Sequence, residues 1–197
     1  MIMKKIYLLS LVFSLFVASC SDILEKVPGT SLPTEEAITS EKDLINAVNG
    51  VYSYQATAVG SYAGEFTLFA DLRGSDFQSI SATNHAGPIY HYQLTKNDGL
   101  VYNFYETFYL SLARLNSVLE ASENITGENV DNLKGELYAL RALYHFDLAR
   151  LFAKNPSPAN LSGLGIVLSD KVFETSYIGE RATLQATYDF ILSDLNK

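Results

Sequence analysis

The chain has 197 residues, with 14 Lys and Arg against 22 Asp and Glu, so its formal net charge is −8. Hydrophobic residues make up 48% of the chain, which is enough to bury a core and too many for a disordered protein. The acidic balance argues against a nucleic-acid partner, because phosphate contacts need clustered Lys and Arg. The single cysteine excludes a disulfide framework and a zinc site built from several cysteines.

The first residues have the layout of a secretory signal. Two lysines precede a stretch of 13 residues, 6–18, that is apolar except for two serines. That stretch is too short to span a bilayer. Val17-Ala18-Ser19-Cys20 resembles a lipobox, although an ordinary signal peptide with an incidental cysteine has the same layout. Because the only cysteine lies at the expected place, we expect a lipoprotein signal over residues 1–19 and lipid on Cys20.

Lipid on Cys20 would anchor the chain to the membrane durably, since several acyl chains bury many methylene groups. The polar run that follows contains Pro28, Gly29 and Pro33, and it predicts an extended tether over residues 20–35.

Helical spacing of apolar residues predicts four helices in the remaining chain, residues 36–197. They are expected over residues 40–60, 101–122, 131–152 and 183–197. The third is the clearest, and its apolar residues cover most of its circumference, so it should pack on several sides. Its main stripe is Leu133, Leu137, Leu140, Tyr144, Leu148 and Leu151. The second and third helices should form an antiparallel pair like one tetratricopeptide unit, flanked by the first and fourth.

Two segments lack helical spacing. Residues 62–100 are rich in Gly, Ser, Asn, Asp and Tyr, and they predict one long irregular segment whose aromatic content favours order. Residues 156–179 predict a loop with one short strand at Ile166–Leu168.

Several segments together resemble the SusD/RagB family of nutrient-binding outer-membrane lipoproteins of Bacteroidetes. The segments are Cys20–Glu25, Glu41–Leu44, Gly50–Tyr52, Tyr105–Leu119, Glu136–Phe146, Gly165–Leu168, Arg181–Thr183 and Tyr188–Leu195. The family often has Trp where this chain has Tyr105, a change that packing can absorb. The resemblance covers nearly the whole chain but only the front part of such proteins. The sequence is therefore expected to be the N-terminal helical domain, truncated at its C-terminus.

The resemblance implies a mainly α fold, in which tetratricopeptide-like helix pairs form an α-solenoid scaffold and a long segment builds the ligand surface. It also implies a surface lipoprotein of the outer membrane that captures oligosaccharide for a SusC-like TonB-dependent transporter. The protein would be no enzyme and would need no cofactor. The alternative is a truncated scaffold that keeps a transporter-facing surface but binds no ligand.

The irregular segment supplies the candidate ligand residues. Sugar binding needs flat aromatic faces against pyranose rings and planar polar groups to bond the hydroxyls. The candidates are Arg73, Asp76, Tyr90, Tyr92 and Asn97, with Tyr62 as a further ring and Asn84 as a further amide. The alternative is a Tyr-rich loop that packs on the scaffold.

Enzyme patterns are weak. Glu65, Asp71 and Asp76 could supply two carboxylates for glycoside hydrolysis, but aspartates beside glycine and serine also form turns. The three histidines do not form the His-Glu-x-x-His pattern of metalloproteases, and no metal site is predicted. Arg141 and His145 lie four residues apart on an apolar helix. We interpret them as a structural pair that satisfies buried carbonyls or a carboxylate such as Glu136 or Asp147.

Overall fold

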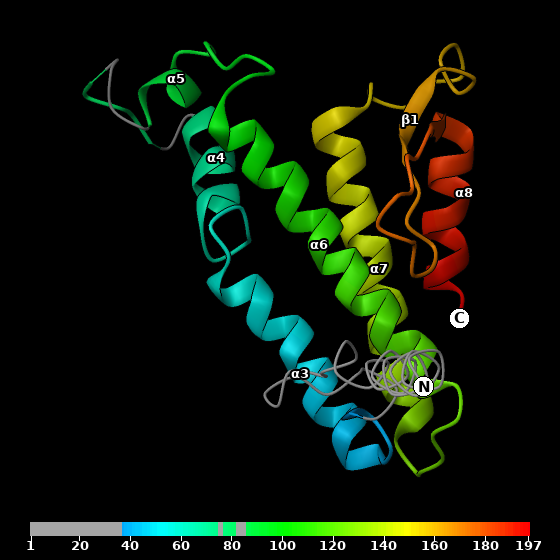
Figure 1. Ribbon diagram of the computed structural model, residues 1–197. Helices are drawn as coiled ribbons and strands as arrows, with labels where there is room; N and C mark the ends of the chain where they lie inside the picture. Colours follow the sequence, from blue (N-terminus) through cyan, green and yellow to red (C-terminus); the bar gives the residue numbers. More distant parts are fainter. Residues whose placement is uncertain (1–36, 75–76, 82–85) are drawn as a thin grey trace, which may run out of the picture. The chain divides into compact units, whose positions relative to one another are not determined.

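The computed structural model describes residues 37–74, 77–81 and 86–197. The chain divides into two units, Met1–Ala37 and Ile38–Lys197. The second unit holds the helices and strands named here (Figure 1). The predicted signal over residues 1–19, Cys20 and the tether over residues 20–35 lie outside the described residues, as do Asp76 and Asn84.

The four predicted helices are present. They are α3 (Glu41–Thr57), α6 (Gly99–Ser122), α7 (Val130–Phe152) and α8 (Leu184–Leu195). Ser40 caps α3, because its hydroxyl accepts the N–H of Asp43 at 3.3 Å and donates to the Asp43 carboxylate at 2.7 Å. The Asp43 carboxylate also accepts the backbone N–H of Thr39 at 3.3 Å, so the pair resembles a capping box with Asp in place of Glu.

Helix α7 lies at the centre of the core, as its apolar circumference predicts. It contacts α3, α6, α8 and strand β1 (Leu164–Val167). A short turn joins it to the preceding helix α6, which runs beside it (Figure 1). Leu137, Tyr144 and Leu148 are fully buried, whereas Leu140 of the predicted stripe is only half-buried. The helix therefore packs on several sides, although its main stripe is not buried along its whole length.

The prediction of one irregular segment over residues 62–100 was wrong in part. It contains α4 (Glu65–Arg73) and the single turn α5 (Gly87–Tyr90). Helix α4 is held by the burial of Phe66 and Leu72, which face the core. Its N-terminal Gly64 provides no side-chain cap, and the helix has only 9 residues, so its sequence carries little periodic signal.

The predicted short strand pairs with a second strand that the pattern did not predict. Strand β1 runs antiparallel to β2 (Arg181–Thr183), with an irregularity in the pairing between its ends. The Arg181 guanidinium donates to the carbonyls of Gly165 at 2.6 Å and Phe152 at 2.8 Å, which ties the hairpin to the end of α7. A Cβ on Gly165 would lie 2.7 Å from the Thr183 carbonyl, so the close approach requires glycine.

Candidate ligand-binding surface

Arg73, the last residue of α4, is held by two aromatic rings. Its guanidinium carbon lies 4.1 Å from the centre of the Tyr92 ring and 5.3 Å from that of Phe69. Phe69 packs edge-on against Phe104 of α6, 5.4 Å away. A line of contacts therefore runs from the core to Arg73, and the arginine is positioned by the scaffold.

Tyr92 completes this cluster from the turn after α5. Its hydroxyl donates to the backbone carbonyl of Arg73 at 2.9 Å. Its φ of 59° makes it the one non-glycine residue with positive φ in the part of the chain that the structure describes. Such a conformation costs free energy for a residue with a Cβ and is often found at binding sites. Because 63% of Tyr92 is exposed, the pair presents an aromatic ring and a cation to solvent.

Tyr90 behaves differently from Tyr92. It is half-buried, packs against the core beside the fully buried Ile89, and meets the His91 ring edge-on at 5.1 Å. Only part of its ring is accessible to a ligand.

Asn97 lies exposed in the turn that begins α6. The Asp98 carboxylate accepts the backbone N–H and the hydroxyl of Thr95, the latter at 2.7 Å, and the Asn97 N–H donates to the Thr95 hydroxyl at 3.4 Å. These bonds fix the backbone conformation of the turn from which the side-chain amide of Asn97 extends. A hollow of about 230 Å³ adjoins the turn, and its lining includes Pro88, Leu94 and Asn103. Its size is below that of a typical ligand pocket.

Tyr62 does not belong to this surface, which corrects its place among the predicted rings. It is half-buried and packs edge-on against Phe66 at 5.2 Å and Phe108 at 5.7 Å, two residues of the core. Its hydroxyl donates to the carboxylate of Asp147, which also pairs with Arg150 at 2.8 Å. Burial raises the pKa of Asp147, while the bond from Tyr62 acts in the opposite direction.

The carboxylates proposed for glycoside hydrolysis do not form a facing pair. Glu65 and Asp71 are six residues apart on α4, so their side chains leave the helix about 120° apart. The Glu65 carboxylate accepts the side-chain amide of Asn103 at 3.2 Å. Asp76, the third carboxylate, lies outside the described residues.

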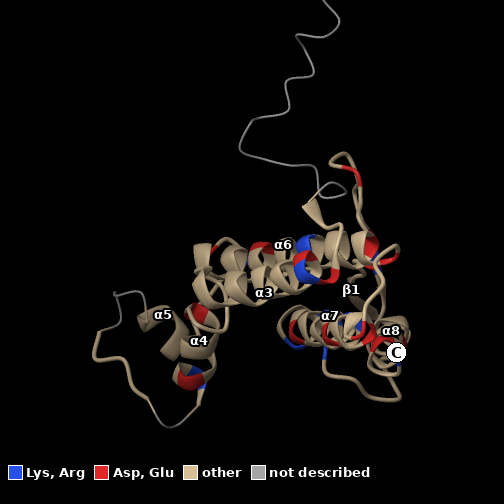
Figure 2. Ribbon diagram, turned by 90° about the horizontal axis from the view of Figure 1, so that it is seen from below, with Lys and Arg blue, Asp and Glu red and all other residues tan. Residues whose placement is uncertain are grey.

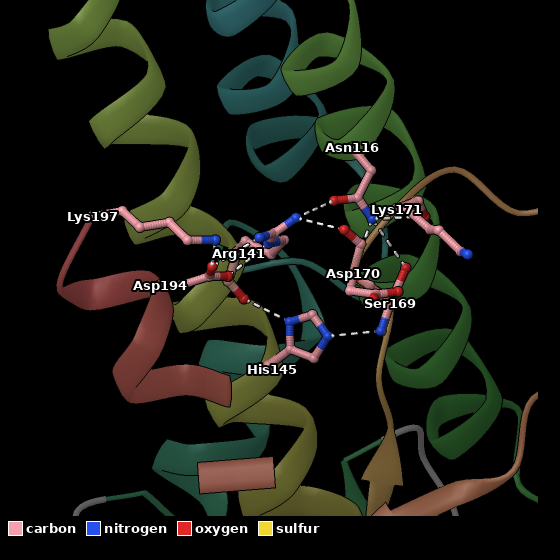
Figure 3. A network of polar contacts seen from close by, with 8 residues as sticks. All are labelled: Asn116, Arg141, His145, Ser169, Asp170, Lys171, Asp194 and Lys197. Carbon is pink, nitrogen blue, oxygen red and sulfur yellow. Dashed lines mark hydrogen bonds and ion pairs between the residues drawn. The ribbon is translucent and has the colours of Figure 1, made fainter. Parts of the chain in front are cut away.

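A buried polar network joins α6, α7 and α8 at the other side of the molecule (Figure 3). The Arg141 guanidinium makes a bidentate pair with Asp194, Nε to Oδ2 at 2.6 Å and Nη2 to Oδ1 at 2.8 Å. It also donates to the side-chain carbonyl of Asn116 at 3.0 Å and to the Asp170 carbonyl at 2.8 Å. The structural interpretation of Arg141 holds, but its carboxylate is Asp194 and not Glu136 or Asp147.

His145 extends the network as a neutral ring. Its Nε2 accepts the Ser169 N–H at 3.0 Å, so Nδ1 carries the proton and donates to the Arg141 carbonyl at 2.8 Å. Burial lowers the pKa of His145 to about 4. A hollow of about 440 Å³ adjoins the network, lined by both signs of charge, including Glu120, Lys134 and Lys171. Four basic and three acidic side chains line this hollow, and the buried arginine serves to hold the scaffold together.

The charge and hydropathy of the described residues further limit the kinds of site that this part of the chain can form. Lys and Arg lie beside Asp and Glu along α4, α6 and α7 (Figure 2). Within residues 37–74, 77–81 and 86–197, no group of three His, Cys, Asp or Glu side chains is arranged to hold a metal ion. None of the helices described there is both long and apolar enough to cross a bilayer.

The family model described as "Starch-binding associating with outer membrane" matches residues 22–197. The chain belongs to the SusD-like family. SusD-like protein P38 of Formosa agariphila is 25% identical over 207 residues, which is 99% of this chain and 38% of that protein. The chain thus spans well under half of this curated relative. The resemblance predicted from the sequence is confirmed.

Solved structures of SusD superfamily proteins have the same fold. One from Bacteroides fragilis matches with a TM-score of 0.72 at 24% identity, covering 82% of this chain and 39% of that one. One from Bacteroides vulgatus matches with a TM-score of 0.66 at 27% identity, covering 79% and 36%. The predicted fold class, mainly α with tetratricopeptide-like helix pairs, is confirmed.

Proposed function

We propose that the protein captures oligosaccharide at the outer membrane and delivers it to a SusC-like TonB-dependent transporter. Membership of a family described as starch-binding and outer-membrane-associated supports the class of function. The observation that carries the proposal is the Arg73–Tyr92 pair, which is fixed by the scaffold and still open to solvent.

The pair has the chemistry that a sugar needs. The exposed part of the Tyr92 ring offers an apolar face to a pyranose, and a tyrosine loses little entropy on binding because it has only two side-chain torsions. Arg73 adds planar donors for hydroxyl groups. Asn97 and Tyr90 stand on adjoining turns and would contact a longer ligand. Asp76, which lies outside the described residues, stays a proposed ligand contact on its chemistry alone.

We also propose how the protein reaches its place of action. Residues 1–19 are a lipoprotein signal, Cys20 carries the lipid, residues 20–35 form a tether, and residues 36–197 are the SusD-like N-terminal helical domain. The lipid holds the domain on the outer membrane, at the cell surface, where it meets both the oligosaccharide and the transporter. The protein is not an enzyme and uses no cofactor.

One observation favours a second function. Because the chain spans 38% of its Formosa relative, segments outside it could supply the ligand surface. The chain would then be a scaffold that contacts the transporter and binds no ligand.

Titration calorimetry of the full chain with maltooligosaccharides, the fragments of starch, tests the proposal. Tyr92→Ala and Arg73→Ala should each weaken binding by about 5- to 30-fold, which corresponds to ~1–2 kcal/mol. Tyr177→Ala is the control, because this tyrosine is also exposed but stands in the loop between β1 and β2. If the intact chain binds no oligosaccharide yet co-purifies with the transporter, the scaffold function is correct. Hydrolysis of starch by the chain alone would support a glycoside hydrolase.

A further inference from the structure

Arg73 carries a positive charge that no described carboxylate neutralises. The ion pairs within residues 37–74, 77–81 and 86–197 involve Arg141, Arg150 and Lys197, and Arg73 belongs to none of them. Among the same residues, the hydrogen bond at Arg73 is made by its backbone carbonyl and not by its guanidinium. The side chain is nevertheless half-buried. A cation that has partly left water is therefore without an anionic partner in the described part of the chain.

The acidic side chains near Arg73 in the sequence are engaged elsewhere. Glu65, Asp71 and Asp98 are the acidic residues that the structure describes between positions 60 and 100. The Glu65 carboxylate accepts an amide of α6 at 3.2 Å, and the Asp98 carboxylate accepts the hydroxyl of Thr95 at 2.7 Å. Asp71 stands two residues before Arg73 on α4, so the two side chains leave the helix about 160° apart. The guanidinium is thus open to an acid from outside the chain.

The rings beside Arg73 prepare its guanidinium for an anion. Tyr92 and Phe69 approach it to 4.1 and 5.3 Å, measured from the guanidinium carbon to each ring centre. Aromatic rings stabilise the cation but take up few of its five N–H donors, which lie in the plane of the group. Apolar neighbours also lower the local dielectric constant, so an ion pair formed here is stronger than one in water.

We propose that the oligosaccharide is acidic and that Arg73 binds one of its negative groups, a uronate carboxylate or a sulfate ester. The oxygens of such a group accept two parallel N–H bonds from a guanidinium, and these bonds are stronger than those to a neutral hydroxyl. The exposed ring of Tyr92 would stack on a sugar ring of the same ligand. This inference rests on the proposed function, because it names the class of sugar that the same surface takes.

Titration calorimetry with matched acidic and neutral sugars tests the charge preference. Oligogalacturonides are compared with their methyl esters, which keep the same backbone without the charge. Carrageenan oligosaccharides are compared with their desulfated forms, and maltooligosaccharides serve as a further neutral probe. The full chain should bind the acidic member of at least one pair about 10- to 100-fold more tightly than its neutral member. The pair that shows the preference identifies the negative group as carboxylate or sulfate.

Arg73→Gln assigns the preference to this residue. The variant keeps planar N–H donors for hydroxyl groups but loses the charge, so acidic and neutral members should bind with equal affinity. Arg114→Gln is the matched control. Its guanidinium carbon also lies 4.1 Å from the centre of a tyrosine ring, that of Tyr54, but it stands on α6 away from the candidate surface. The preference should survive this change.

Three results would contradict the inference. Equal affinity of the unaltered chain for acidic and neutral sugars would overturn it and leave the proposed function standing. A preference for acidic sugars that survives Arg73→Gln would overturn the role of this arginine. Failure to bind any of these sugars, maltooligosaccharides included, would contradict the proposed function itself and the inference with it.

Discussion

The guanidinium of Arg141 and the carboxylate of Asp194 form a buried bidentate ion pair between α7 and α8. The two residues are 5% and 2% exposed, and their closest atoms are 2.6 Å apart. Lys197 adds a third charge at 3.0 Å from the Asp194 carboxylate. Burial makes this pair sensitive to the loss of either partner, because the remaining charge would have no compensation.

Asp194→Ala should therefore lower the free energy of unfolding by about 3–5 kcal/mol. The matched control is Asp189→Ala on the same helix, where the side chain is exposed and accepts a bond from Gln185. That change should cost under about 0.5 kcal/mol. Urea denaturation of the two variants measures both values, and similar costs would show that the buried pair contributes little to stability.

Tyr62 and Tyr144 should respond in opposite ways to the loss of the side-chain hydroxyl. Tyr62 donates to the buried carboxylate of Asp147, whereas the Tyr144 hydroxyl has no partner in the described part of the chain. Tyr62→Phe should lower the free energy of unfolding by about 1.5–3 kcal/mol, the range for a bond to a charged acceptor. Tyr144→Phe should be neutral or stabilising. A larger loss from Tyr144→Phe than from Tyr62→Phe would contradict these assignments.

Stability should fall in mild acid because of His145. Burial lowers the pKa of this residue to about 4 in the folded chain, against about 6.5 in the unfolded chain. Between these values the unfolded chain binds a proton that the folded chain excludes. The free energy of unfolding thus decreases from about pH 6.5 down to pH 4, by ~3 kcal/mol in all.

Urea denaturation across this pH range tests the role of the ring. His145→Gln should flatten the pH dependence, whatever its effect on stability at neutral pH. His91→Gln, at an exposed histidine, controls for the loss of an imidazole. A slope that is unchanged by His145→Gln would exclude this residue as its cause.

Membrane attachment should depend on Cys20. Cys20→Ala removes the only thiol that could receive lipid, so the protein should move to the soluble fraction. Ser21→Ala controls for a change next to the cleavage point. Fractionation followed by immunoblotting gives the distribution. A Cys20→Ala protein that remains in the membrane fraction would refute the lipid anchor.

The sequence predicts best those helices in which apolar residues recur at helical spacing over many turns. Helices α6 and α7 repeat an apolar face over 24 and 23 residues, so their ends were predicted to within two residues. Helix α4 was missed because Phe66 packs against Phe104 and Phe108 of α6, a contact that no local pattern reveals. The partners of Arg141 and Tyr62 were missed for the same reason, since Asp194 is 53 residues away and Asp147 is 85 residues away.

The sequence predicted which residues belong to the candidate site, but not how these residues are arranged in space. Arg73 and Tyr92 were chosen for their chemistry, but the structure alone shows that they touch each other. The contact depends on a positive φ at Tyr92, a conformation that sequence patterns assign to Gly or Asn. A strained tyrosine in such a position could not be predicted from residue preferences.

That strain leads to a prediction about position 92 itself. Tyr92→Ala and Tyr92→Gly both remove the ring and its contacts with Arg73, so both should lose oligosaccharide affinity to the same extent. Only the alanine variant keeps a Cβ on a backbone in the left-handed conformation, and there a Cβ lowers the stability by about 1–2 kcal/mol. The glycine variant should therefore be more stable than the alanine variant by ~1 kcal/mol, which reverses the usual order. Tyr102 is the control, because it is 61% exposed within α6, and there alanine should be the more stable residue. Urea denaturation gives the four stabilities. If alanine is favoured at both positions, the backbone at Tyr92 is unstrained, and the Arg73–Tyr92 pair is an ordinary surface contact.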